Sequence, residues 1–215
     1  MNILYSAAAL IIAYLLGSIP SAVWAGKLLH GIDVRKHGSG NAGATNVIRV
    51  LGWKTGLPVL LFDLFKGWLA AMMPLFLNSA EPGSAMIANI QIAAGLMAIT
   101  GHILPVFADF RGGKGVATMF GVLLALQPLL TLSCMGVFLV VLLISGIVSL
   151  SSMIAGIAFP LLLFLFFDTP SMVFKIFAVI VAIALILTHR KNSGRLLRGE
   201  ENKLNIFGKK DKPAS

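Results

Sequence analysis

Three polar clusters hold most of the residues in this sequence whose types and spacing could do chemistry. Residues 38–46 read GSGNAGATN, residues 101–118 contain the run RGGKG, and residues 189–201 begin with HRKN. Each cluster combines glycine with basic, hydroxyl or amide groups, which bind phosphate in many proteins. The three clusters are therefore candidate anion-binding sites.

The run RGGKG precedes a predicted helix that begins near Val116. Because glycine lacks a Cβ atom, its backbone N–H groups can turn toward one anion at the helix N-terminus, and lysine adds a full charge. The candidate phosphate-binding residues of this run are Arg111, Gly112, Gly113, Lys114 and Gly115. The spacing does not match G-x-x-x-x-G-K-[ST], so a nucleoside triphosphatase is not predicted. A flexible basic turn at a membrane surface is the alternative interpretation.

The first cluster could form an anion-binding nest or cap a helix that starts near Ala44. Arg49 would lie one turn further along that helix. A capped turn alone explains Ser39 and Thr45, but it does not explain the density of glycine and amide groups. The candidate phosphate-binding residues here are Gly40, Asn41, Thr45 and Asn46.

His102 and His189 each stand at the end of an apolar segment, beside basic residues. An imidazole exchanges a proton near neutral pH, so either histidine could act in acid–base catalysis or contact a substrate. The sequence contains no H-E-x-x-H zinc motif and no carboxylate cluster suited to magnesium. We predict no metal site and no cofactor.

Asp63 and Lys66 lie three residues apart in an apolar segment, so a helix would place them on one face. Charges inside a membrane are costly and often functional. We interpret this pair as structural, an ion pair that packs its helix against neighbouring helices.

The composition predicts an integral membrane protein. Of the 215 residues, 58% are hydrophobic and only 12% are charged, whereas soluble domains have about 25% charged residues. The net charge of +9 does not indicate nucleic-acid binding, because the basic residues lie in short loops without a binding motif.

We predict an all-α fold with about seven transmembrane helices in one domain, residues 1–215. Residues 116–167 carry no charge, and one helix of that length would measure about 78 Å against an apolar core of about 30 Å. This stretch must fold back, with breaks expected at Gln127-Pro128 and at 149–152. The predicted spans are 3–25, 56–77, 85–106, three within 116–167, and 172–188.

The basic residues predict the orientation. Fifteen of the 17 Lys and Arg residues fall in the loops 26–55 and 107–115 or after residue 188, all on one side of a seven-helix arrangement. The positive-inside rule then places the N-terminus outside and the C-terminus in the cytoplasm, with 202–215 as a basic cytoplasmic tail. From the residues alone, a membrane-embedded transferase and an anion transporter both fit this cytoplasmic face. A transporter lacks support from an inverted repeat, and a purely structural subunit would leave the three clusters unexplained.

The three clusters resemble the motifs of a known family, the bacterial acyl-phosphate-dependent glycerol-3-phosphate acyltransferases called PlsY. The resemblance rests on SGNAGATN at 39–46 with Arg49 downstream, GHILPVFADFRGGKGVAT at 101–118 and HRKNSGRLLRGEE at 189–201. It implies seven helices with an outside N-terminus, in a bacterial inner membrane. It also implies transfer of an acyl group from acyl phosphate to sn-glycerol 3-phosphate, giving 1-acyl-glycerol 3-phosphate and phosphate.

The resemblance implies catalytic roles for four residues, Ser39, Arg49, His189 and Asn192. It implies phosphate binding by Arg195 and a structural role for Glu201, which could pair with Arg195. The expected partners are the two phosphorylated substrates and membrane lipid, with no nucleic acid and no obligate protein partner. We expect direct transfer, in which the enzyme mainly positions the substrates and stabilises charge. The base could be His189 or a phosphate oxygen of a substrate.

Overall fold

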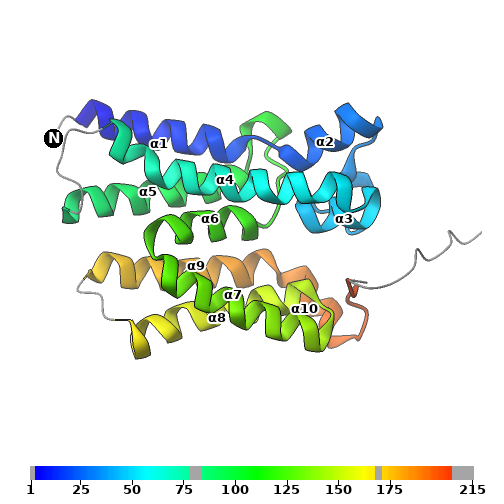
Figure 1. Cartoon of the computed structure of the whole chain (residues 1–215). Helices are drawn as coiled ribbons and strands as arrows, with labels where there is room; N and C mark the ends of the chain where they lie inside the picture. Colours follow the sequence, from blue (N-terminus) through cyan, green and yellow to red (C-terminus); the bar gives the residue numbers. More distant parts are fainter. Residues whose placement is uncertain (1–2, 78–83, 168–170, 205–215) are drawn as a thin grey trace, which may run out of the picture.

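The computed structural model describes residues 3–77, 84–167 and 171–204, and within these ranges the regular structure is entirely helical. The all-α prediction is therefore confirmed. The α-helices shown in Figure 1 are α1 Ile3–Ser18, α2 Ser21–His30, α3 Ala44–Leu51, α4 Trp53–Leu77, α5 Ala85–Ile103, α6 Val116–Leu126, α7 Pro128–Ser145, α8 Val148–Phe166, α9 Met172–Thr188 and α10 Arg190–Leu197. Two short 3₁₀ helices, η1 Val34–Lys36 and η2 Val106–Ala108, lie in the connections.

Proline marks two of the breaks between helices. Pro20 separates α1 from α2, which meet at an angle of 41°, because proline has no N–H to continue the hydrogen-bond ladder. The predicted first span is thus a bent pair. Pro128 begins α7, at the predicted Gln127-Pro128 break.

The second break predicted within 116–167 was misplaced. The chain turns at Gly146, whose φ of +68° suits glycine, and α8 already begins at Val148. The serines expected to break the helix lie inside α8. The hydroxyls of Ser151 and Ser152 donate to carbonyls one turn earlier at 2.8 Å, so a helix satisfies them without a break.

Four segments are long and apolar enough to cross a membrane by themselves: 53–77, 85–108, 128–145 and 148–166. The bent pairs α1–α2 and α9–α10 raise this number to six within the described residues. Helix α6 has 11 residues and a length of about 16 Å, short of an apolar core of about 30 Å. The count of seven spans and the orientation of the termini stay predictions. Residues 190–197, which follow the last predicted span, form a further short helix, α10.

Small residues let two helix pairs approach closely. A Cβ atom added to Gly17 of α1 would collide with the backbone of Ala98 in α5. In the same way, Gly67 of α4 meets the backbone of Thr118, and Gly121 of α6 meets that of Leu64. Such packing is typical of helices in membranes, where close backbone contact replaces the hydrophobic effect.

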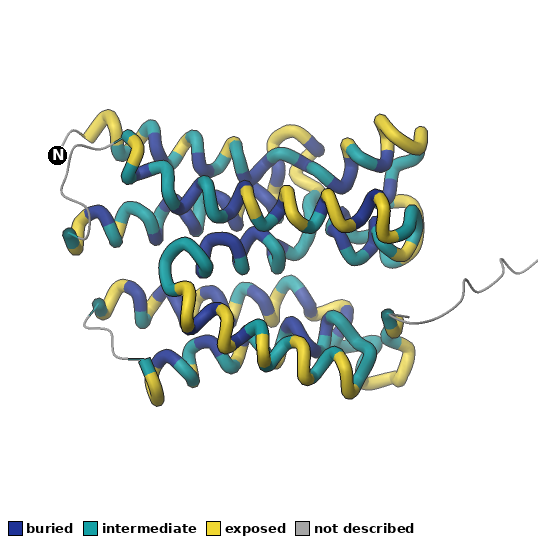
Figure 2. Tube along the Cα trace, viewed as in Figure 1, coloured by how far each residue is buried: buried dark blue, intermediate teal, exposed yellow. Residues whose placement is uncertain are grey.

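The helices form two groups on either side of α6 (Figure 1). Helices α1 to α5 lie on one side, and α7 to α10 lie on the other. The largest apolar core joins α6, α7, α8 and α9 and also includes Ala71 of α4 and Ile92 and Ile99 of α5. Figure 2 shows many exposed positions along α7, and those side chains include Leu129, Leu132, Leu143 and Ile144, as expected for a face in contact with lipid.

The two ends of the bundle differ in polarity. Helices α3 and α10 lie at the end opposite the N-terminus in Figure 1. We call this the polar end, because it gathers residues of the three polar clusters.

Candidate functional site

A cavity of about 500 Å³ lies between the two helix groups and brings all three polar clusters together. Its polar wall is formed by Ser39, Asn41, Thr45, Asn46, Arg49, His102, Lys114, Gly115, His189, Asn192, Arg195 and Glu201. Most of the predicted site residues are thus neighbours of one space. The rest of the wall is mainly apolar and comes from α4 and α6 to α9, with Phe120, Leu123, Met135, Phe138, Phe159 and Val181 among its residues.

Glu201 organises the third cluster and links it to the second. Its carboxylate accepts hydrogen bonds from Asn192 Nδ2, from Arg195 Nε at 2.6 Å and from Ser149 Oγ at 2.9 Å. The expected pairing of Glu201 with Arg195 is therefore present. Asn192 is buried, and its Oδ1 accepts a hydrogen bond from the ammonium of Lys114. This chain of contacts holds Lys114 against α10.

The charges at the polar end do not balance. Burial, together with the nearby Arg195 and Arg49, lowers the pKa of Lys114 to about 8, although Glu201 acts in the opposite direction. Burial alone would raise the pKa of Glu201, but the hydrogen bonds from Arg195, Asn192 and Ser149 outweigh it and hold the pKa below its usual value. Three cations thus face one carboxylate, and a phosphate group would supply the missing negative charge.

Arg49 is the cation with the most freedom to bind a ligand. It lies in the last turn of α3, it lines the cavity, and within the described residues its guanidinium has no hydrogen-bond partner. Its five N–H donors are therefore available to an anion, in the fork geometry that suits phosphate.

His189 is buried at the C-terminal end of α9, with 2% of its surface exposed, and it lines the cavity. Its Nδ1 lies 2.8 Å from the carbonyl oxygen of Leu185. A carbonyl oxygen can only accept, so Nδ1 carries the hydrogen. In the neutral imidazole Nε2 is then unprotonated, which leaves it as the atom that can accept a proton.

Two N–H groups of the glycine loop are not free to bind phosphate, in contrast to our expectation from the sequence. Gly112 and Gly113 donate their N–H groups to the last carbonyls of α5, one of them that of His102. These two donors are therefore committed to the fold. The N–H groups in the first turn of α6 have no partner within that helix or elsewhere in the part of the chain that the structure describes, and Val116 and Ala117 line the cavity.

Asn46 also has a different role from the predicted one. Its side chain is buried, with Nδ2 donating to the carbonyl oxygens of Val34 and His37 at 2.9 and 3.1 Å. Its Oδ1 accepts from the N–H and the hydroxyl of Ser39 at 2.8 and 3.1 Å. The Asn46 amide is thus used to hold Ser39 in place, and it has no group left for phosphate.

Two further predicted residues do not reach the cavity. Gly40 and Arg111 are exposed, and neither lines the space between the helix groups. Gly40 has a φ of +71°, so its identity is explained by the turn it makes. Thr45, Asn41 and Gly115 do line the cavity.

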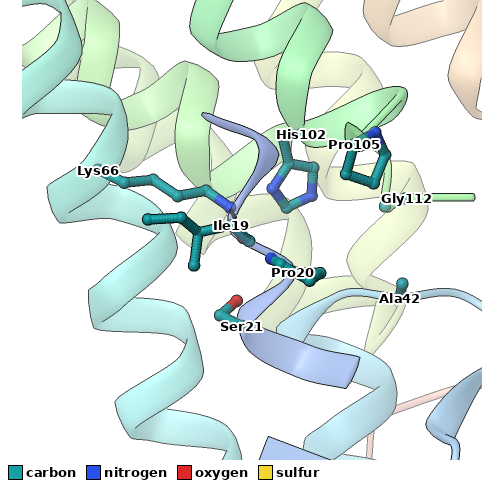
Figure 3. Close-up of a pocket in the computed structure, with 9 residues that line it drawn as sticks. Ile19, Pro20, Ser21, Ala42, Lys66, His102, Pro105 and Gly112 are labelled. Carbon is teal, nitrogen blue, oxygen red and sulfur yellow. Dashed lines mark hydrogen bonds between the residues drawn. The ribbon is translucent and has the colours of Figure 1, made fainter. Parts of the chain in front are cut away.

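Asp63 and Lys66 form the buried ion pair expected from their spacing, at 2.8 Å and with 1% and 3% of their side-chain surfaces exposed. Lys66 also donates to the carbonyl oxygen of Ile19, and Ser21 donates to Asp63 at 2.7 Å. Figure 3 shows Lys66 reaching from α4 to the break between α1 and α2, beside the ring of His102. A cavity of about 10 Å³ adjoins these groups, the size of one water molecule.

Sequence reasoning missed Ser149 and Thr118. Ser149 donates to Glu201, and the fully buried Thr118 hydroxyl lies 3.0 Å from His102 Nδ1. Both are small polar residues within apolar segments, and such residues also occur there with no partner beyond their own helix. Ser149 and Thr118 differ from such residues only in having partners far away in the sequence, Glu201 and His102.

Comparisons with known proteins agree with this geometry. Residues 7–199 match the sequence profile of the family described as glycerol-3-phosphate acyltransferase. The glycerol-3-phosphate acyltransferase of Chlorobaculum tepidum is 44% identical over 228 residues, covering 95% of this chain and 98% of that protein. The corresponding protein of Chlorobium limicola is 41% identical, covering 94% and 97%.

Two solved structures resemble the fold. They are crystal structures of PlsY (YgiH), an integral membrane glycerol 3-phosphate acyltransferase, in a glycerol 3-phosphate form and a lysophosphatidic acid form. The first has a TM-score of 0.82 and 36% identity, covering 93% of this chain and 96% of that one. The second has a TM-score of 0.78 and 34% identity, covering 92% and 94%. The profile, the relatives and the two structures lead to one conclusion: this chain belongs to the glycerol-3-phosphate acyltransferase family and is an integral membrane protein.

Proposed function

We propose that this chain transfers the acyl group of acyl phosphate to sn-glycerol 3-phosphate, producing 1-acyl-sn-glycerol 3-phosphate (lysophosphatidic acid) and phosphate, the first step of phospholipid synthesis. One observation carries the proposal: a single cavity joins a cation-rich polar end to a long apolar region. An acyl donor with a phosphate head needs both. Glycerol 3-phosphate and lysophosphatidic acid, which characterise the two PlsY crystal forms, are the expected acceptor and product here.

The compactness of the cationic group favours acyl phosphate as donor. Lys114, Arg49 and Arg195 line one end of one cavity, which suits small phosphate groups. The three sequence motifs shared with acyl-phosphate-dependent enzymes support the same choice. A thioester of coenzyme A would need a further site for its nucleotide.

In the proposed reaction a hydroxyl oxygen of glycerol 3-phosphate attacks the acyl carbonyl carbon. The new ester C–O bond forms, the bond from the carbonyl carbon to the phosphate oxygen breaks, and phosphate leaves with the electron pair. Nε2 of His189 accepts the proton of the attacking hydroxyl, since Nδ1 is committed to Leu185. Lys114 and the two arginines hold the phosphates and stabilise the developing charge.

We infer direct transfer without an acyl-enzyme. The hydroxyl of Ser39 hydrogen-bonds the Asn46 amide, so it lacks the histidine contact that would activate a nucleophilic serine. Ser39 instead contributes to substrate positioning at the cavity wall. Intact-mass measurement after incubation with acyl phosphate alone tests this step, because an acyl group added to Ser39 would contradict it.

The polar end faces the cytoplasm in this proposal, and the chain lies in a bacterial inner membrane. The positive-inside rule supports this orientation. In a Cys134→Ser background, a cysteine at Lys203 should react with an impermeant thiol reagent only from the cytoplasmic side, and one at Ser84 only from the outside. The reverse labelling would overturn the orientation.

The decisive assay uses the detergent-purified chain without any other protein. Phosphate release from acyl phosphate should depend on glycerol 3-phosphate and should match the lysophosphatidic acid formed. Acyl-coenzyme A in place of acyl phosphate should give no product. Efficient turnover with acyl-coenzyme A would disprove the donor assignment. Glycerol 3-phosphate uptake into vesicles without acyl transfer would instead support the transporter alternative.

A further inference from the structure

His102 contacts the segment that carries Lys114 on both sides of that lysine. Before Lys114, the N–H of Gly113 donates to the carbonyl oxygen of His102 at 3.1 Å. After Lys114, the hydroxyl of Thr118 in the first turn of α6 lies 3.0 Å from Nδ1 of His102. One residue at the end of α5 therefore joins the two segments that flank the lysine.

The glycine loop also packs directly on His102. A Cβ atom added to Gly113 would collide with Nε2 of the ring, and one added to Gly112 would collide with the His102 carbonyl oxygen. In Figure 3 the ring lies between Lys66 and Gly112, and its Nδ1 is 3.6 Å from Oδ1 of Asp63. Only 7% of the surface of His102 is exposed. Because the surroundings are close-packed, the ring cannot move without moving the loop.

Thr118 lies too deep to touch a substrate. It is 0% exposed and belongs to the wall of neither cavity, whereas its neighbour Ala117 lines the large one. Within the part of the chain that the structure describes, the ring of His102 is the only hydrogen-bond partner of the Thr118 hydroxyl. Any effect of this hydroxyl on the reaction must therefore pass through the groups that it holds.

We propose that His102 is a positioning residue, which fixes the glycine loop through Gly113 and Thr118 and thereby keeps the ammonium of Lys114 at the phosphate site. The inference rests on the proposed function, because it needs Lys114 to hold a substrate phosphate. The lysine side chain is long and flexible, so its ammonium is placed only as well as its backbone. A shift of about 1 Å in a group that positions a substrate can lower the rate by about a hundredfold.

The first test removes the Thr118 hydroxyl. Thr118→Val keeps the shape of the side chain but leaves Nδ1 of His102 without this partner. The kcat/KM of the purified enzyme should fall by roughly tenfold, the usual effect of losing a buried hydrogen-bond partner. Thr118→Ser keeps the hydroxyl and should retain most of the activity. Thermal unfolding, measured on the same samples, shows whether each variant is folded.

Ser151→Ala is the matched control. Ser151 is also 0% exposed and also lies outside the cavity wall, but its hydroxyl donates to the carbonyl oxygen of Ile147 within its own helix. Its removal should leave kcat/KM unchanged.

A second pair of variants acts on the ring itself and stands in if Thr118→Val does not fold. His102→Asn keeps a polar group near the place of Nδ1, whereas His102→Leu has a similar volume and no polar group. The asparagine variant should therefore be several times more active than the leucine variant, by the same hydrogen bond.

A double-mutant cycle shows whether the effect passes through Lys114. In a Lys114→Ala background, Thr118→Val should change kcat/KM by less than about twofold, because the group that it positions is already absent. If turnover in that background is below detection, the Kd of glycerol 3-phosphate, measured by calorimetry, completes the same cycle. Independent losses that multiply would overturn the inference, since Thr118 would then act on another group.

Wild-type kcat/KM in Thr118→Val would also overturn it, and so would an equal loss of activity in Thr118→Ser. All of these results would leave the proposed function intact, because wild type would still form product. Failure of the proposed function looks different: wild type would form no lysophosphatidic acid from acyl phosphate and glycerol 3-phosphate.

Discussion

Two groups of buried charges in this molecule differ in how completely they are satisfied. Asp63 and Lys66 form a closed pair whose further hydrogen bonds go to Ser21 and to the carbonyl of Ile19. At the polar end, by contrast, three cations, Lys114, Arg49 and Arg195, face the single carboxylate of Glu201. The first group is complete without a ligand, whereas the second needs an anion to balance its charge. In this molecule, charge balance therefore separates the structural ion pair from the candidate binding site more clearly than burial does.

The largest expected effect comes from breaking the closed pair. Lys66→Met leaves the Asp63 carboxylate buried without its cation and should lower the free energy of unfolding by about 3–5 kcal/mol. Thermal unfolding in detergent measures this change. The double variant Asp63→Leu/Lys66→Met should recover much of the loss, because it leaves no unpaired charge. A fully stable single variant would show that the pair does not hold α4 to the α1–α2 break.

Removal of Lys114 should instead reduce activity and leave the fold intact. In Lys114→Ala a contact to a phosphate in a poorly solvated site is lost, at about 2–5 kcal/mol or roughly 30- to 4000-fold in kcat/KM. Steady-state kinetics with both substrates measure the loss. The unfolding temperature should stay near that of wild type. Wild-type kinetics in Lys114→Ala would favour the alternative interpretation, in which RGGKG is a basic turn at the membrane surface.

Glu201→Gln tests whether the carboxylate organises the polar end. The variant keeps the shape but loses the charge that accepts hydrogen bonds from Arg195, Asn192 and Ser149, a loss of about 1.5–3 kcal/mol for a charged hydrogen bond. A loss of this size should lower activity by roughly 10- to 160-fold. The effect should appear chiefly in kcat, because Lys114 loses its support through Asn192. An unchanged kcat would show that Glu201 does not position the site.

The smallest expected effect is a pH dependence. The pKa of Lys114 is lowered to about 8, so its ammonium is charged below pH 8 and loses its proton as the pH rises through that value. Above pH 8, kcat/KM should therefore fall by at most about tenfold per pH unit. Lys114→Arg keeps its charge over this range and should show a flatter alkaline limb. The same alkaline limb in both proteins would assign the ionisation to another group.

The helical class, the break at Gln127-Pro128 and the gathering of the three polar clusters could all be predicted from the sequence. Apolar segment lengths, proline and glycine act locally, so these features can be read without knowing any partner. The pairing of Asp63 with Lys66 is local too, because one helix turn separates them. The break predicted at 149–152 was wrong. The serine hydroxyls there hydrogen-bond within their own helix, and the chain turns at Gly146 instead.

Which polar groups are free to bind a ligand depends on contacts between residues that are far apart in the sequence. Asn46 and the N–H groups of Gly112 and Gly113 are hydrogen-bonded within the fold, whereas Arg49 and the first turn of α6 have no such partner among the described residues. Lys114 and Asn192 meet across 78 positions of sequence. The apolar wall of the cavity is formed by residues of α4 and of α6 to α9, which come together only in the folded chain. Hydrogen bonds and packing between helices join residues that are far apart in the sequence, so a local sequence pattern does not predict them.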